Sequence, residues 1–362
     1  MQKKPFLFLL AFTLLAFILS SCADDNEPGS LRSSFSSLKF SSPRSGEKFT
    51  FGDTIHFDLK LIKESNKIVE SLGLYINGEL IHEEKASEML FDYPTTAGSG
   101  GSIKIKGVVK FSDGTNSRRR MEISVLSDRA AEKMTYQLVN SYPHDVTSYT
   151  QGLIYDSKEG LLFEGTGNYS ESKLLKIKVG DEKAKKEIPI SDQYFGEGIT
   201  MLHDTIFQLT YKNKKGFYYD REFNLLGEFT YPSEGWGLTT DGTSLIMSDG
   251  SATLFYLNPH SFEIKKSIQV FNDKGLMYNI NELEYVDGII YANIYQTDFI
   301  AKIDAHSGQL LGLINMKGIL DKNLVEGRID VLNGIAYNPQ MNTFYVTGKW
   351  WPRLFEVRFV KE

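Results

Sequence analysis

Five residues able to take part in chemistry recur at intervals of 39 to 51 residues in the C-terminal two-thirds of the chain: Gln151, Glu197, Trp236, Glu282 and Asn333. Each begins a segment that reads as a strand, a turn and a second strand. The ends of the same five hairpins carry Gly167, Tyr211, Gly250, Tyr295 and Lys349. Since the first residue and the last residue of an antiparallel hairpin lie at the same end, each pair is predicted to meet.

A hairpin that repeats every 40 to 50 residues is typical of a β-propeller. Residues 135–362 hold five such units, and each inner hairpin precedes outer strands, predicted at 174–179, 216–220, 253–258 and 299–304. Only 352–359 follows the last hairpin, so we expect 135–142 to supply the missing strand and close the ring. Inner hairpins line the central channel, which predicts that the ten positions form a binding pocket at one mouth.

Structural roles for these residues stay open at this point. Gly167 and Gly250 fit turns, Trp236 fits a core, and Lys349 fits a solvated surface. Glu197 and Glu282 could each accept hydrogen bonds from backbone amides near the channel. Strand alternation also predicts that Glu282 and its neighbour Asn281 cannot both face the channel.

Motifs for metal or nucleophilic catalysis are missing from the sequence. The six histidines are scattered without HxH or HExxH spacing, and no GxSxG segment occurs. Asp241-Gly242 and Asp249-Gly250 read as turns rather than calcium ligands, so a structural calcium ion has no support. An enzyme built from these residues is expected to need no cofactor and to use general acid–base catalysis.

The N-terminal segment reads as an export signal. Lys3 and Lys4 precede an apolar run, 5–19, and Leu19-Ser20-Ser21-Cys22 is similar to a bacterial lipobox. This predicts a signal peptide over 1–21 and lipid attachment at Cys22, the only cysteine. Ala23 follows, which by resemblance to lipoprotein sorting signals implies the outer membrane. An ordinary cleaved signal is the alternative.

The rest of the N-terminal part is predicted to be a tether and a small β domain. Residues 22–36 are rich in Ser, Asp, Asn, Gly and Pro, as flexible linkers are. About seven short alternating strands over 37–127 predict an immunoglobulin-like sandwich, and 128–134 reads as a linker. The net charge of −6 argues against nucleic acid as a partner and gives no attraction to anionic lipid. The membrane link would therefore be the lipid on Cys22 alone.

Motifs in every predicted blade resemble the plant and bacterial glutaminyl cyclases, also called glutamine cyclotransferases. The segments that carry the resemblance are Tyr142-Pro143-His144-Asp145, Tyr149-Thr150-Gln151-Gly152, Phe195-Gly196-Glu197-Gly198, Glu234-Gly235-Trp236-Gly237-Leu238, Ser248-Asp249-Gly250, Asn281-Glu282-Leu283-Glu284, Leu332-Asn333-Gly334-Ile335 and Gly348-Lys349-Trp350-Trp351-Pro352. The resemblance covers about 135–362 and implies a five-bladed propeller, in agreement with the repeats.

The resemblance implies conversion of an N-terminal glutamine of peptides to pyroglutamate, with ammonia released. Its implied active-site residues are Gln151, Glu197, Trp236, Asn281 and Lys349, so in the fourth blade it favours Asn281 over Glu282. The implied substrate-binding residues are Trp236, Tyr149, Phe195, Tyr211 and Tyr295, to which the repeat register adds Asn333.

The predicted chemistry assigns Glu197 to shuttle a proton from the attacking amine to the leaving nitrogen. Lys349, Asn281 and Gln151 would donate hydrogen bonds to the oxyanion. Two alternatives remain: a non-catalytic propeller that binds peptides or other ligands at the same mouth, and a sugar-active lyase or hydrolase that uses Glu197 and Glu282.

Overall fold

A computed structural model describes residues 37–62, 67–96, 100–321, 323 and 325–362. The predicted signal peptide, Cys22 and the tether lie outside these residues. All the strands described below belong to one unit, Ser36–Glu362. The named elements of the described ranges are all strands, β1 to β28. Within those ranges no helix has the length and apolar character needed to cross a membrane.

The N-terminal strands form two sheets around one apolar core. A three-stranded sheet has the order β1 (Leu38–Ser42), β3 (Thr54–Leu61), β6 (Glu88–Pro94). A five-stranded sheet has the order β2 (Lys48–Thr50), β8 (Asn116–Leu126), β7 (Gly101–Phe111), β4 (Val69–Ile76), β5 (Glu79–Glu84). Alternate residues of both sheets, such as Phe57 and Leu74, fill the core. The eight strands are compatible with the expected sandwich.

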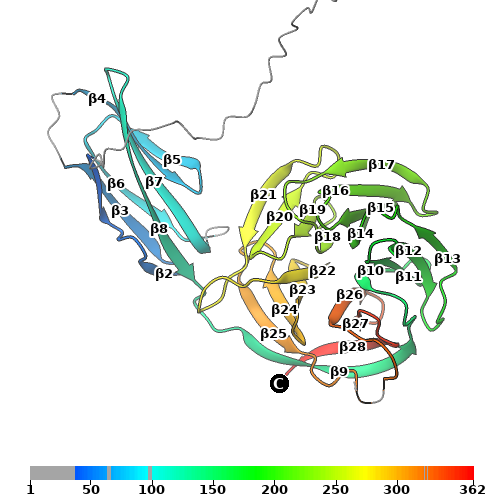
Figure 1. Cartoon of the computed structure of the whole chain (residues 1–362). Helices are drawn as coiled ribbons and strands as arrows, with labels where there is room; N and C mark the ends of the chain where they lie inside the picture. Colours follow the sequence, from blue (N-terminus) through cyan, green and yellow to red (C-terminus); the bar gives the residue numbers. More distant parts are fainter. Residues whose placement is uncertain (1–36, 63–66, 97–99, 322, 324) are drawn as a thin grey trace, which may run out of the picture. The chain divides into compact units, whose positions relative to one another are not determined.

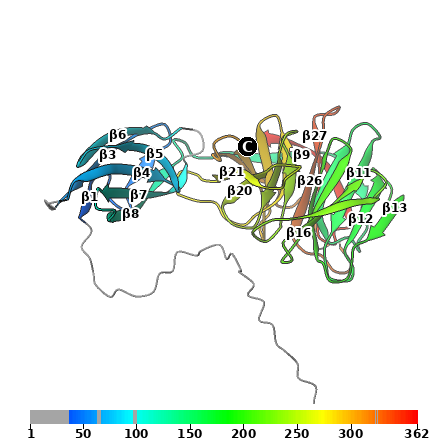
Figure 2. The same ribbon diagram turned by 90° about the horizontal axis from the view of Figure 1, so that it is seen from above.

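Three separate four-stranded sheets follow, and each is one blade of a propeller. They are β10 (Thr150–Asp156), β11 (Leu161–Thr166), β12 (Lys173–Lys178) and β13 (Lys186–Pro189); β14 (Gly196–Leu202), β15 (Thr205–Thr210), β16 (Lys215–Asp220) and β17 (Leu225–Thr230); and β18 (Leu238–Thr240), β19 (Leu245–Ser248), β20 (Thr253–Leu257) and β21 (Ile264–Gln269). The blades are arranged around a ring (Figure 1), and strands of one blade, such as β11, β12 and β13, lie side by side from above as well (Figure 2).

An eight-stranded sheet holds the last two blades. The fourth blade is β22 (Ile280–Val286), β23 (Ile289–Ile294), β24 (Phe299–Asp304) and β25 (Leu310–Asn315). The fifth is β26 (Leu332–Asn338), β27 (Thr343–Gly348), β28 (Arg353–Lys361) and β9 (Glu132–Pro143). Strand β9 therefore comes from the opposite end of the propeller sequence, as predicted for 135–142.

Strand β9 closes the ring by pairing with both blades. It runs antiparallel to β28 from Arg353↔Pro143 to Lys361↔Met134, and its first residues pair in parallel with β25. The strand begins at Glu132, inside the segment predicted to be a linker. Those first residues are recruited because β25 offers an otherwise unpaired edge.

The inner strands of neighbouring blades approach each other so closely that only glycine fits. A Cβ on Gly152 would lie 2.4 Å from the backbone nitrogen of Ile199, and one on Gly198 would lie 2.6 Å from that of Leu238. Each glycine directly follows a residue of the repeated set, Gln151 or Glu197. Glycine at these positions therefore brings the repeated side chains together around a narrow channel.

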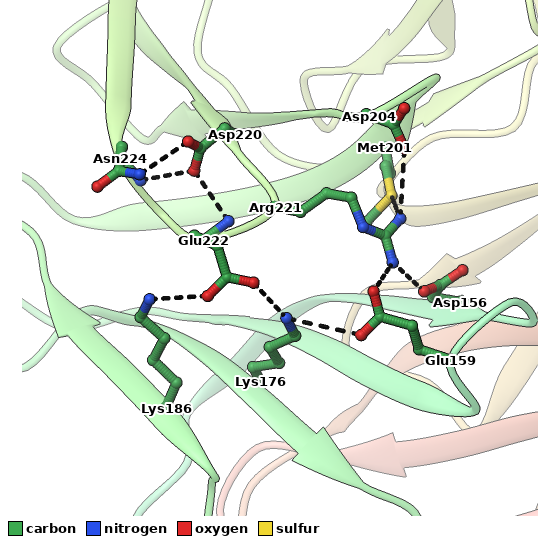
Figure 3. A network of polar contacts seen from close by, with 10 residues as sticks. All are labelled: Asp156, Glu159, Lys176, Lys186, Met201, Asp204, Asp220, Arg221, Glu222 and Asn224. Atoms are coloured by element: carbon green, nitrogen blue, oxygen red, sulfur yellow. Dashed lines mark hydrogen bonds and ion pairs between the residues drawn. The ribbon is translucent and has the colours of Figure 1, made fainter.

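Asp156 ends β10, whereas Gln151 lies near its start. Around Asp156, charged residues join the first two blades (Figure 3). Arg221 pairs with Asp156 and with Glu159, the latter at 2.7 Å. Glu222 pairs with Lys176 and Lys186, each at 3.0 Å. This network fixes the first blade against the second. It lies at the opposite end of β10 from the candidate site.

Candidate active site

The repeated residues lie where the inner hairpins begin, and backbone hydrogen bonds join them to the hairpin ends. Tyr211 donates its N–H to the Phe195 carbonyl at 3.0 Å, and Lys349 donates to Val331 at 3.0 Å. The prediction that both ends of each hairpin meet is confirmed at these blades. Side chains at the starts of the hairpins and side chains at their ends can therefore face the same mouth of the channel.

Aromatic side chains from four blades form an arc that consists of two groups of touching rings. Ring centroids lie 5.9 Å apart for Tyr211 and Phe195, 6.0 Å for Phe195 and Tyr149, and 5.4 Å for Tyr295 and Trp236. The Nζ of Lys349 connects the two halves of this arc, because it lies 4.5 Å from the Tyr149 ring centre and 5.4 Å from that of Tyr295. The structure thus brings together four of the predicted aromatic residues, Trp236 and Lys349.

Glu197 and Lys349 are buried ionisable groups with unused hydrogen-bonding capacity. Only 5% of Glu197 and 3% of Lys349 is exposed. Among the residues that the structure describes, neither side chain has a hydrogen-bond or ion-pair partner within the usual distances. Charged groups are almost never buried in this way unless paired, which marks both as functional candidates.

The two groups also influence each other electrostatically. Burial raises the pKa of Glu197 well above its usual value, the nearby Lys349 opposes this shift, and Glu234 adds to it. Burial lowers the pKa of Lys349, whereas Glu197 and Asp330 act to raise it. A carboxyl group with a raised pKa can both accept and return a proton near neutral pH.

The strand is irregular at Asn281 and Glu282, so simple alternation does not describe this part of it. The pairing of β22 with β23 shifts register between Ile280 and Leu283, as in a β-bulge. Both side chains are consequently buried, with 3% of Asn281 and none of Glu282 exposed. Similar shifts occur at Gln151, Glu197 and Asn333.

Glu282 and Asn281 differ in their partners. The Glu282 carboxylate accepts hydrogen bonds from the backbone N–H of Leu153 at 3.2 Å and of Ile335 at 2.9 Å, and so joins the first and fifth blades. The Oδ1 of Asn281 is buried without a hydrogen-bond partner in the described structure. Glu282 is thus occupied by the fold, while Asn281 is not.

Gln151 is held by Asn333. The Nδ2 of Asn333 donates to the Oε1 of Gln151 at 3.2 Å and to the Thr150 carbonyl at 3.0 Å. This bond occupies the Gln151 oxygen, and no described residue accepts from its amide nitrogen. Asn333 has no exposed surface, so it would act on a ligand only through Gln151.

Three residues near this site were not predicted as site residues from the sequence. Glu234 accepts a hydrogen bond from the Trp236 Nε1 at 3.2 Å. Asp330 accepts one from the Tyr149 hydroxyl at 3.4 Å. Trp350 has a φ of 59°, which is unusual for a bulky residue. Glu234 and Trp350 belong to the segments that carry the family resemblance, whereas Asp330 had no motif to reveal it.

A buried histidine–glutamate pair, His144 and Glu164, lies next to the strand that carries Gln151. His144 Nε2 lies 3.2 Å from both carboxylate oxygens of Glu164, and its Nδ1 lies 2.8 Å from the Trp351 carbonyl. Burial lowers the pKa of His144, but Glu164 and the carbonyl outweigh it, so the pKa lies above its usual value. Thr150 Oγ1 donates to Glu164 at 2.7 Å, which connects the pair to the residue before Gln151.

No group of three or more His, Cys, Asp or Glu residues suited to a metal ion occurs within the described part of the chain. Asp249 and Asp241 act as turn residues, as predicted. Asp249 accepts from the Ser251 N–H at 3.0 Å, and Asp241 from the Thr243 N–H at 2.8 Å.

Comparisons with known proteins agree with this fold. The family model described as glutamine cyclotransferase matches residues 111–359, which is more than half of the chain. The match begins before the 135–362 segment that the motifs indicated. The chain is 37% identical over 227 residues to a glutaminyl-peptide cyclotransferase of Arabidopsis thaliana, and the alignment covers 61% of this chain and 70% of the relative.

A solved structure shares the fold. The crystal structure of Myxococcus xanthus glutaminyl cyclase matches with a TM-score of 0.60 and 29% sequence identity. The match covers 64% of this chain and 99% of the other. The resemblance seen in the blade motifs is thereby confirmed. With five hairpins that converge on a buried glutamate and lysine, and a family model that spans them all, this chain belongs to the glutamine cyclotransferase family.

Proposed function

We propose that this protein converts the N-terminal glutamine of peptides to pyroglutamate and releases ammonia. The observation that carries the proposal is the pair Glu197 and Lys349, an acidic and a basic group that are both buried and have no hydrogen-bond or ion-pair partner among the described residues. Family membership and the glutaminyl-peptide cyclotransferase relative support the same reaction. The substrates would be peptides or proteins that begin with glutamine.

Glu197 is proposed to move the proton. The neutral α-amine attacks the side-chain amide carbon of the glutamine, a carbon–nitrogen bond forms, and the amine gives a proton to the Glu197 carboxylate. Glu197 then returns this proton to the amide nitrogen, whose bond to carbon breaks as ammonia leaves. The raised pKa of Glu197 suits a group that must both take and give a proton.

Lys349, Asn281 and Gln151 are proposed to bind the oxyanion that forms on the amide oxygen. Lys349 has no competing ion pair in the described ranges, and the Gln151 amide nitrogen has no acceptor there. Loss of one such donor typically costs about 3 kcal/mol of transition-state stabilisation. The support for this assignment is that, within the described part of the chain, neither the Lys349 ammonium nor the Gln151 amide nitrogen has an acceptor, and that Asn281 is implied by the family resemblance.

The aromatic arc is proposed to bind the apolar part of the glutamine side chain. Tyr149, Phe195, Tyr211, Tyr295 and Trp236 all contact a neighbour in this arc. Rings fixed against each other can hold the amine and amide within attack distance, which contributes to the rate by orientation.

The central experiment is incubation of the purified protein with a glutamine-initiated tripeptide. We expect ammonia release in equal amount to a product lighter by one ammonia. Binding of the peptide without ammonia release would favour the alternative, a non-catalytic peptide-binding propeller. The sugar-active alternative is not supported, because Glu282 is fully buried and occupied by two backbone donors.

Catalysis without a metal or another cofactor is also proposed, on the strength of the acid–base and donor groups already at the site. EDTA or phenanthroline should leave the rate of ammonia release unchanged. A loss of activity that added zinc restores would contradict this part of the proposal.

The predicted localisation remains a proposal as well. We propose that the protein is exported and carries a lipid on Cys22, which anchors it to the outer membrane. The support is the lipobox-like segment that ends at Cys22. In bacteria, Cys22→Ser should move the protein from the detergent phase of a Triton X-114 extract to the aqueous phase. An unchanged distribution would contradict the lipid anchor.

A further inference from the structure

Asp330 lies beside the candidate site, but it is not one of the residues predicted for that site from the sequence. Its N–H donates to the Lys349 carbonyl at 2.9 Å, while the Lys349 N–H donates to Val331 at 3.0 Å. The Nε1 of Trp351 donates to the Asp330 carbonyl at 2.8 Å. The backbone of Asp330 is therefore fixed to the segment that carries Lys349.

The side chain of Asp330 is fixed as well. Its Oδ1 accepts from the Val331 N–H at 2.9 Å, and its Oδ2 accepts from the Tyr149 hydroxyl at 3.4 Å. The ring of the same tyrosine lies 4.5 Å from Lys349 Nζ. Asp330 and Lys349 thus both contact Tyr149, one at its hydroxyl and one at its ring face.

Two carboxylates and two tyrosine rings are the groups that act on the Lys349 ammonium. Carboxylates of Glu197 and Asp330 act on it electrostatically, and Tyr149 and Tyr295 present their rings. Among described residues no carboxylate lies within 4.0 Å of its Nζ, and no cation lies within that distance of the Asp330 carboxylate. The charge of Asp330 is therefore not cancelled by another ion pair.

Proton transfer creates a demand that Asp330, the other described carboxylate that acts on Lys349, can meet. When Glu197 has taken the proton of the substrate amine, it is neutral and no longer favours the ammonium form of Lys349. Burial disfavours a charged lysine, so an ammonium without a carboxylate nearby would tend to lose its proton. This would happen at the step in which the oxyanion needs a positive donor.

We propose that Asp330 is the permanent counter-ion of Lys349, a positioning residue that keeps this lysine charged and in place while Glu197 carries the substrate proton. The inference rests on the proposed function. It divides the two carboxylates near Lys349 between two tasks. Glu197 exchanges a proton in each cycle, and Asp330 exchanges none.

Asp330→Asn tests this assignment, because asparagine keeps the shape and the backbone pairs but removes the charge. Loss of a nearby negative charge lowers the pKa of Lys349, so the ammonium is lost at lower pH. We expect the alkaline limb of the kcat/KM profile to move to lower pH by about one unit. Above that limb kcat should fall about ten-fold, and KM should change little.

Two further variants separate the charge from the structure. Asp330→Glu restores the charge and should return the limb toward its original pH. Asp249→Asn removes another carboxylate near a hairpin end, one whose Oδ1 is held by Ser251, and should leave the limb unmoved. An unmoved limb in Asp330→Asn, with kcat lowered at every pH, would overturn the proposal in favour of a purely structural role.

The protonation of Lys349 can also be measured directly, in an experiment that does not depend on cyclase activity. Acetylation of Lys349 by acetic anhydride, followed by mass spectrometry across a pH series, reports when its amine becomes neutral. The midpoint should move to lower pH in Asp330→Asn, and an unchanged midpoint would overturn the proposal. If the unmodified protein releases no ammonia while this midpoint still moves, the proposed function fails and the counter-ion role stands.

Discussion

Glu197 and Glu282 begin equivalent strands in two blades, yet their surroundings give them different roles. Glu282 accepts two backbone hydrogen bonds, whereas the carboxylate of Glu197 has no donor in the described structure. A residue type at a repeated position therefore does not define its role. The partners that the fold supplies or withholds define it.

The proposed donor role of Lys349 predicts a loss in turnover more than in stability. Lys349→Met keeps the apolar stem and removes the ammonium, so kcat should fall about 10²- to 10³-fold. The thermal midpoint should change little, since no described ion pair is broken. Lys212→Met, which removes a lysine 4.8 Å from the Tyr211 ring centre, is the control and should retain most activity. A loss below ten-fold for Lys349→Met would contradict the assignment.

The raised pKa of Glu197 predicts the acid limb of the pH profile. Only the deprotonated carboxylate can accept the amine proton, so kcat/KM should rise with pH through the pKa of Glu197. Glu234 raises that pKa by its negative charge. Glu234→Gln should therefore move the acid limb to lower pH, and its carboxamide oxygen can still accept from Trp236. A limb that moves to higher pH would show that another group titrates.

At the scale of the residue, the repeats predicted the residues that recur once per blade and gave no signal for those that do not. Gln151, Glu197 and Trp236 followed from the register of the hairpins. Asn281 followed only from the family resemblance, because a β-bulge places it beside Glu282. Asp330 lies in irregular backbone before β26, where periodicity gives no signal.

At the scale of the elements, the bulges and glycines of the inner strands shape the channel mouth. The register shifts in four blades fall at the residues that the site uses. Simple alternation could not predict them, although glycine within a strand is itself a sign of a bulge or a close approach. Gly152 and Gly198 carried that signal.

The hydrogen bonds of Glu282 across two blades predict a role in stability. Glu282→Ala leaves two buried N–H groups without acceptors, so the free energy of unfolding should fall by about 2–5 kcal/mol. Chemical denaturation at constant pH measures this loss. At a temperature where the variant is folded, kcat should stay within a few-fold of the original. A variant that is stable but inactive would place Glu282 in the chemistry instead.

At the scale of the whole molecule, the ring is closed by strand β9, which pairs along nine residues of β28. The repeats predicted the number of blades because the hairpin pattern recurs once per blade. They also predicted the closing strand because too few strands follow the last hairpin. The start of β9 at Glu132 could not be predicted, since its first residues pair with β25 only in the folded ring.

Closure by β9 predicts where the propeller can be shortened. Residues 128–362 retain β9 and should cyclise a glutamine-initiated peptide at nearly the rate of the full chain. Residues 144–362 lose β9, expose the edge of β28, and should unfold or aggregate. Thermal melts and ammonia release measure both outcomes. A folded, active 144–362 fragment would show that closure by β9 is dispensable.

The most direct test of the account compares Glu197→Gln with Glu282→Gln in the ammonia-release assay. Both variants remove one buried carboxylate from an equivalent position. If Glu197 shuttles the proton, Glu197→Gln should lose about 10³-fold or more in kcat/KM with its thermal melt preserved, while Glu282→Gln should lose stability and keep its activity. Near-normal cyclisation by Glu197→Gln would contradict the central claim.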